Sequence, residues 1–361
     1  MKTDDSAILS VDFLAGFTIF LVALIFVINM MPGLLIGVHS SGVDYNAVAY
    51  RTSVILAEDP GSPVSPSWEL FDEAHKDEIQ RLGLSVSSDT PNILSTEKIR
   101  KFFNIFDTRQ TDDFKFSMQD YRDMAIFGDI PYSFNISLKE VSKPALYTGE
   151  PVPKSEYGYM KRLVKVKHYS SADLSGGDLN KTGVNLPSVE QPHNYDCGIS
   201  FTMKYSELFD KTISPAYRID PKNEPLMFKI TDFSQSLNST DVKYVTLDKV
   251  RFVKDGVEIS MPYETIDNKT YFFTIDGVQY NMTPSPPVDM SDKSEIEFEL
   301  MPTLMFSSEI TSTLALQFNF SYEFETNSSN YPIEGEIIYS YNSPHITDPY
   351  LTDAVMEVCI W

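Results

Sequence analysis

The sequence is poor in basic residues. Lysine and arginine together number 29 against 51 aspartate and glutamate residues, so the 361-residue chain carries a net charge of −22. Proteins that bind nucleic acids use clustered lysine and arginine to meet the phosphates, and this balance argues against a nucleic-acid partner. An acidic chain instead has a well-solvated surface that repels its neighbours until specific contacts form.

Cysteine is almost absent, with Cys197 and Cys359 as the two examples. They lie too far apart in sequence for a metal-binding motif. In an oxidising compartment they could form one disulfide that closes a loop of about 160 residues, which the chain-entropy treatment makes strongly stabilising. The alternative is a pair of free thiols that pack as small apolar residues, and the sequence leaves both open.

Known catalytic motifs are also missing. None of the five histidines has a partner at the HExxH spacing of zinc enzymes, and there is no GxSxG elbow, P-loop or GxGxxG turn. Residues 173–180, DLSGGDLN, resemble a calcium loop only faintly, because alternating oxygen ligands and a terminal glutamate are lacking. We therefore expect no enzyme, no cofactor and no metal. A hydrolase site assembled from scattered acids is the alternative.

Charge is absent altogether from residues 13–38, FLAGFTIFLVALIFVINMMPGLLIGV. As a helix this stretch would be about 39 Å long, and about 20 apolar residues suffice to cross a bilayer. We predict a single membrane-spanning helix in contact with lipid, in preference to a buried core helix or a cleaved secretory signal. Pro32 and Gly33 predict a kink in it. Asp12 places an acid at the edge of the apolar run, which is unfavourable without a partner.

Seven N-x-S/T triplets follow in the C-terminal two-thirds of the chain. Such triplets accept N-linked glycans on external proteins, so they predict that this part is extracellular and the protein a single-pass component of the cell membrane. Asn281 is the weakest of the seven because Pro284 follows its threonine. The predicted glycosylation sites are Asn135, Asn180, Asn238, Asn268, Asn319 and Asn327.

The rest of the chain divides into a helical and a strand-rich part. Apolar spacing and capping residues predict helices over 44–58, 67–84, 95–106 and 120–127. From about residue 130 the pattern changes to alternation rich in aromatics, with about ten strands and tight hairpin turns at Asp255-Gly256 and Asp276-Gly277.

We therefore predict an α+β fold with a long N-terminal membrane or assembly helix, a short helical neck and a C-terminal antiparallel β-sandwich-like domain. The expected parts are a leader over 1–12, the helix over 13–38, the neck over 39–128 and the extracellular β-rich domain over 129–361.

The N-terminus resembles archaeal type IV pilin-like proteins, the group that includes pilins and archaellins. The likeness rests on the leader MKTDDSA, on the following ILSVDFLAGFTIFLVALIFVINMMPGLL, and on the acid that stands near its start. It implies cleavage between Ala7 and Ile8, which would make Asp12 the fifth residue of the mature chain. In pilins an acid there is thought to pair with the N-terminal amine of a neighbouring subunit.

Five further segments resemble parts of uncharacterised archaeal pilin-like surface proteins. These segments are AVAYRTSVILAEDPG (47–61), RLGL (81–84), PNILSTEKI (91–99), YSFNISL (132–138) and AVMEVCIW (354–361). The resemblance implies a pilin-like cell-surface structural protein. It would be anchored or assembled through the N-terminal helix, with other copies or pilin-like subunits as partners. A glycosylated β-rich head would serve surface assembly or adhesion. The alternative is a single-pass, membrane-anchored extracellular binding or envelope protein that does not polymerise.

Overall fold

Strands dominate the computed structural model, which describes residues 11–39, 44–105, 114–127, 130–177, 194–236, 242–260, 270–302, 313–324 and 335–361. Strand accounts for 40% and helix for 24% of the described residues, and these strands form three sheets. Each sheet is mixed, because it contains one parallel pair among antiparallel ones. The predicted α+β class with a purely antiparallel domain was therefore wrong. Alternation along a strand gives its buried face but not the direction of its neighbour.

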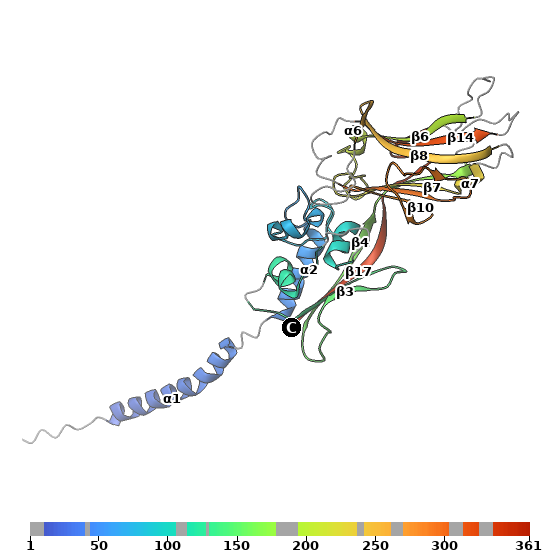
Figure 1. Cartoon of the computed structure of the whole chain (residues 1–361). Helices are drawn as coiled ribbons and strands as arrows, with labels where there is room; N and C mark the ends of the chain where they lie inside the picture. The colour runs from blue at the N-terminus through green and yellow to red at the C-terminus, as the bar shows by residue number, and fades with distance from the viewer. Residues whose placement is uncertain are drawn as a thin grey trace, which may run out of the picture.

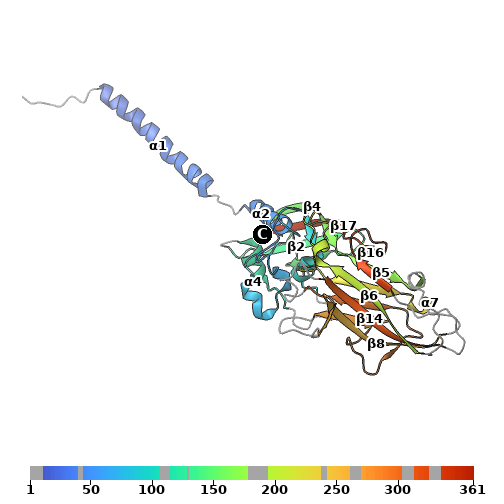
Figure 2. The same cartoon turned by 90° about the horizontal axis from the view of Figure 1, so that it is seen from above.

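The N-terminal helix α1 (Val11–His39) extends away from the rest of the chain in both views of Figures 1 and 2. It passes Pro32 and Gly33 as one helical element. Among the described residues, no helix has both the length and the apolar character to cross a membrane. This finding corrects the predicted single-pass helix and the cell-membrane location inferred from it.

Helix α2 (Tyr45–Glu58) begins the body of the molecule and confirms the helix predicted over 44–58. The Asp44 carboxylate accepts a hydrogen bond from the Ala47 amide at 3.1 Å and so caps its first turn. Its buried face packs on a five-stranded sheet. The sheet order is β1 (Ile93–Ser95), β4 (Gly158–His168), β17 (Tyr350–Ile360), β2 (Phe134–Glu140) and β3 (Leu146–Gly149).

Short helical turns complete this proximal unit, which we define as residues 44–168 and 350–361 within the described ranges. They are η1 (Trp68–Leu70), η2 (Glu73–Glu78), α3 (Thr96–Phe102), α4 (Met118–Tyr121) and η3 (Arg122–Ile126). The single helix predicted over 67–84 is wrong. The indole of Trp68 donates to the carbonyls of Pro60 and Gly83, both at 3.1 Å, and holds the segment folded back. Phe102 and Tyr121 share one core with Phe134 and Val166, so the expected boundary at 128 falls inside this core.

The distal unit, residues 171–347 within the described ranges, is a sandwich of two sheets. The first has the order β11 (Val278–Gln279), β10 (Tyr271–Ile275), β13 (Ile296–Leu300), β7 (Leu226–Thr231), β5 (Ser171–Ser175) and β16 (Ile346–Thr347). The second has the order β12 (Val288–Asp289), β8 (Val242–Lys254), β14 (Thr313–Phe324), β6 (Asn194–Lys204) and β15 (Gly335–Tyr339), with β9 (Val257–Ile259) paired to β8. Aromatic pairs such as Phe252–Phe298, with ring centroids 5.8 Å apart, join the two sheets.

Both predicted hairpin turns are confirmed. Asp255-Gly256 connects β8 to β9 and Asp276-Gly277 connects β10 to β11. All four residues have positive φ, as this class of tight turn requires. Two short helices, α6 (Tyr205–Leu208) and α7 (Phe233–Ser236), follow β6 and β7 respectively.

The distal unit is inserted between β4 and β17 of the proximal sheet. Ser171 pairs with Thr347 in the distal unit, and His168 pairs with Tyr350 in the proximal unit. The two connections therefore continue one antiparallel ribbon from unit to unit. The last strand was expected within the C-terminal sandwich, but it returns to the proximal sheet and pairs with both β2 and β4.

Candidate functional site

The described side chains of α1 form an exposed apolar surface. All residues from 13 to 28 are solvent-exposed, and Ile19 keeps 71% of its surface. The Thr18 hydroxyl donates to the Leu14 carbonyl at 2.7 Å, so the helix satisfies it internally. The large apolar side chains exposed on it are Phe13, Leu14, Phe17, Ile19, Phe20, Leu21, Val22, Leu24, Ile25, Phe26, Val27 and Ile28. A helix that is apolar on all sides is normally buried by its surroundings.

A second apolar surface lies on the outer face of the proximal sheet, opposite α2. It lines a depression of about 1010 Å³, and Leu163 near its centre is 78% exposed. Two cross-strand ion pairs flank Leu163. Lys165 Nζ lies 2.7 Å from an Asp353 carboxylate oxygen, and Lys161 Nζ lies 3.8 Å from a Glu357 oxygen.

A smaller depression of about 280 Å³ lies at the far end of β4, beside His168. The His168 Nε2 lies 2.8 Å from a Glu140 oxygen and 3.0 Å from the Thr352 hydroxyl, and its ring stacks on Tyr350. Burial acts to raise the pKa of Glu140, but hydrogen bonds from Lys143, Thr352 and His168 outweigh it and lower the pKa. These contacts hold the ribbon that joins the two units in place.

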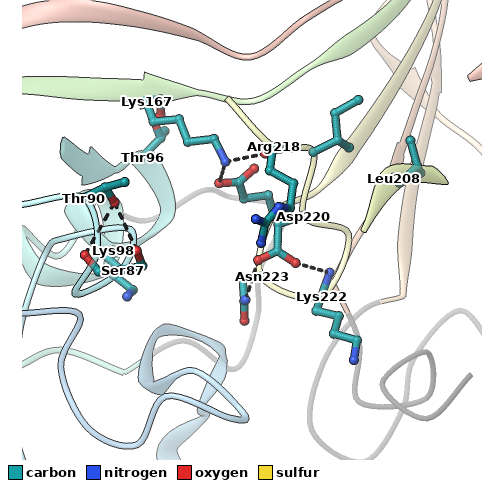
Figure 3. Close-up of polar contacts among 12 residues, drawn as sticks. Ser87, Thr90, Thr96, Lys98, Lys167, Leu208, Arg218, Asp220, Lys222 and Asn223 are labelled. Atoms are coloured by element: carbon teal, nitrogen blue, oxygen red, sulfur yellow. Dashed lines mark hydrogen bonds and ion pairs between the residues drawn. The ribbon is translucent and has the colours of Figure 1, made fainter. Parts of the chain in front are cut away.

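Charged residues gather where the units meet (Figure 3). Lys167 Nζ lies 2.6 Å from a Glu224 oxygen and donates to the Arg218 carbonyl at 2.7 Å, so this strand of the proximal unit is bonded to a distal loop. The Lys98 ammonium donates to the carbonyls of Pro60 and Ser85 at 2.7 and 2.9 Å. We call the buried charged residues here the junction cluster, and its members are Glu69, Lys98, Lys167, Glu224 and Glu299.

Burial shifts the titration of acids at this junction. It raises the pKa of Glu224 to about 7, although the Lys167 ammonium acts to lower it. It also raises the pKa of the adjoining Glu97 to about 7, against the lowering effect of Arg100. The negative charges of Glu299 and Glu69 add to the upward shift at Glu97. The junction is therefore sensitive to proton concentration near neutrality.

No cluster of three or more histidine, cysteine, aspartate or glutamate side chains suited to a metal ion occurs within the described part of the chain. Cys359 on β17 is buried and free, whereas the backbone of Cys197 lies on β6 of a different sheet. The side chain of Cys197 is outside the described residues. The structure thus does not bring the two cysteines together.

Two of the six predicted glycosylation sites lie on described strands. Asn135 on β2 donates from its side-chain amide to the Glu150 carbonyl at 2.8 Å. The side-chain oxygen of Asn319 on β14 is buried, and no described residue bonds to it. Asn180, Asn238, Asn268 and Asn327 lie outside the described residues, as do Ala7, Ile8 and the side chain of Asp12.

Comparison with known proteins adds one relative. An uncharacterized protein of Archaeoglobus fulgidus is 29% identical over 143 residues, which cover 34% of this chain and 75% of that protein. Neither a protein-family model nor a solved structure matches the chain. The comparisons thus leave the function to be argued from the residues themselves.

Proposed function

We propose that this protein is a structural subunit that assembles through α1, with the α1 helices of several copies packed together and the β-rich bodies on the outside. The observation that supports this most is the character of residues 13–28. They are uncharged, and all of them are exposed in the single chain. The likeness of residues 8–35 to pilin-like sequences agrees with the proposal.

The distribution of apolar side chains favours several copies over a single partner groove. Phe17, Leu21 and Leu24 lie on a different side of the helix from Ile19 and Phe26, and all five are exposed. A groove covers one stripe of a helix, whereas a bundle covers all of it. Only neighbouring helices on every side would remove this whole surface from water.

The energies allow such an assembly. Burial of one large apolar side chain contributes about 1.5–3 kcal/mol. Of the twelve exposed on residues 13–28, half would contribute about 9–18 kcal/mol if fully covered. Association costs about 4–15 kcal/mol in lost translational and rotational freedom. Packing of α1 is therefore able to drive assembly, even though the net charge of −22 makes the bodies repel one another.

A pair of matched substitutions tests the proposal in the full chain. Val22 on α1 and Val257 at the start of β9 are similarly exposed, at 61% and 66%. Val22→Lys places a charge in the packed helices and should reduce assembled material at least tenfold by sedimentation and electron microscopy. Val257→Lys adds the same charge to the body and should leave assembly unchanged. Equal effects of the two changes would contradict the proposal.

A further inference from the structure

The outer face of the proximal sheet has a charge pattern that is complementary to itself. Strand β4 presents Lys161, Leu163 and Lys165 on this face. Strand β17 presents Glu357, Val355 and Asp353 beside them, in the same three rows of the sheet. One strand is thus a basic column and its neighbour an acidic column, and each has an apolar residue at its centre.

In the Lys165–Asp353 row the next strands outward add apolar residues, whereas β2 presents Lys139 and Ser137 in the other two rows. Ile93 of β1 pairs with Lys165, and the Val141 amide, just beyond the end of β2, donates to the Asp353 carbonyl. Ile93 and Val141 therefore stand in the same row on opposite flanks of the two central columns. Val141 is exposed. In the next row of the sheet Lys167 is buried, so the exposed face ends before that row.

We infer that a second copy of this chain packs on this face through a two-fold axis that runs along the strands between β4 and β17. This operation places β4 of one copy on β17 of the other while keeping the rows aligned. Leu163 then meets Val355, and the Lys161 and Lys165 ammonium groups meet Glu357 and Asp353 of the second copy. In the flanking columns, Ile93 meets Val141.

The charge balance of this face also favours a second copy as its occupant. On this face Lys139, Lys161 and Lys165 stand against Asp353 and Glu357, because Glu140 turns away to His168, so the face is close to neutral on a chain of net charge −22. Most other surface of so acidic a chain repels an identical copy. This pairing involves no residue of α1, and it is independent of the assembly proposed above.

The test uses two full-length variants in which this face carries opposite charges. Both are made in the Val22→Lys background so that α1 packing is weakened. Lys161→Glu with Lys165→Glu makes the face acidic, and Asp353→Lys with Glu357→Lys makes it basic. The Val22→Lys parent should dimerise in sedimentation equilibrium. Each charge variant alone should bind itself at least tenfold more weakly, and an equimolar mixture of the two should recover the dimer. A monomeric parent, or a mixture as weak as its separate components, would overturn the inference.

Cross-linking gives a second readout that does not depend on charge or on the folding of those variants. A Leu163→Cys chain and a Val355→Cys chain, mixed and treated with a short thiol cross-linker, should form a covalent heterodimer above the level of the parent chain. Yields no higher than those of the parent would contradict the inferred contact. Because both residues lie outside α1, failure here would leave the α1 proposal standing, and success would not establish it.

Discussion

At the scale of single residues, the junction cluster shows where sequence patterns stop being informative. The run KRLVKVKHY (161–169) alternates as a half-buried strand should, and β4 is indeed there. The same alternation places Lys167 on the solvated side with Lys165. In the structure Lys167 is buried because Glu224, far along the chain, lies against it. No local signal marks a partner at such a distance.

The burial of this ion pair predicts a large effect for Glu224→Gln. The change leaves the Lys167 ammonium in a site where 1% of the side chain is exposed, with its charge uncompensated. Breaking a buried pair in this way costs about 3–5 kcal/mol. Glu207→Gln breaks the exposed pair with Lys204, where 49% of the Glu207 side chain is in water, and should cost less than about 1 kcal/mol. Urea unfolding at pH 8 measures both, and equal losses would contradict the account.

The raised pKa of Glu97 predicts a pH dependence of stability. Its folded pKa of about 7 lies above the ordinary glutamate value of 4.5, so the folded state binds the proton more tightly. The free energy of unfolding should therefore fall as pH rises from about 4.5 to about 7, and stay level above that. Groups whose pKa is lowered, such as Asp120 and Glu140, act at more acidic pH. Glu224 adds to the effect in the same direction.

The measurement is the free energy of unfolding at pH 5 and pH 8 for the parent and for Glu97→Gln. The parent should be more stable at pH 5, and the difference should shrink in the variant because an amide does not titrate in this range. Glu207→Gln, at an exposed position on α6, is the control and should keep the parental difference. An unchanged difference in Glu97→Gln would show that another group is responsible.

At the scale of elements, local chemistry was sufficient where the signal was local. The helix over 44–58 with its apolar spacing and the two Asp-Gly turns were all predicted and are all found. The helix predicted over 67–84 failed because Trp68 is bound by two carbonyls from flanking segments. Strand β5 has five residues beside a Ser- and Gly-rich stretch, so no local signal distinguishes it from a loop.

The contact between α2 and β4 provides a test at this scale. A Cβ atom on Gly158 would lie 2.0 Å from the Tyr45 carbonyl oxygen, which is backbone and cannot rotate away. Gly158→Ala should therefore force β4 from the start of α2 and destabilise the chain by about 1–3 kcal/mol. A Cβ on Gly177 meets nothing nearer than 3.8 Å, so Gly177→Ala is the matched control. Thermal unfolding should separate the two, and the same melting temperature for both would contradict the described packing.

At the scale of the whole molecule, the organisation follows from pairings that the sequence does not display. The distal unit is inserted into the proximal sheet, whose strand β17 comes from the very end of the chain. The predicted boundary at residue 128 lies where helices give way to strands along the chain. Residues on both sides of it belong to the proximal core. The uncharged N-terminal segment was evident from the sequence, but the prediction that it spans a membrane was wrong.

Cross-linking at Ile19 tests most directly whether α1 is an assembly element. In the full chain, Ile19→Cys places a thiol at the most exposed large apolar position among residues 13–28 of α1, and Val257→Cys places one on the body. With a short thiol cross-linker, Ile19→Cys should form covalent dimers and Val257→Cys should match the parent background. Equal cross-linking at the two positions, or none above background at position 19, would contradict packing between α1 helices.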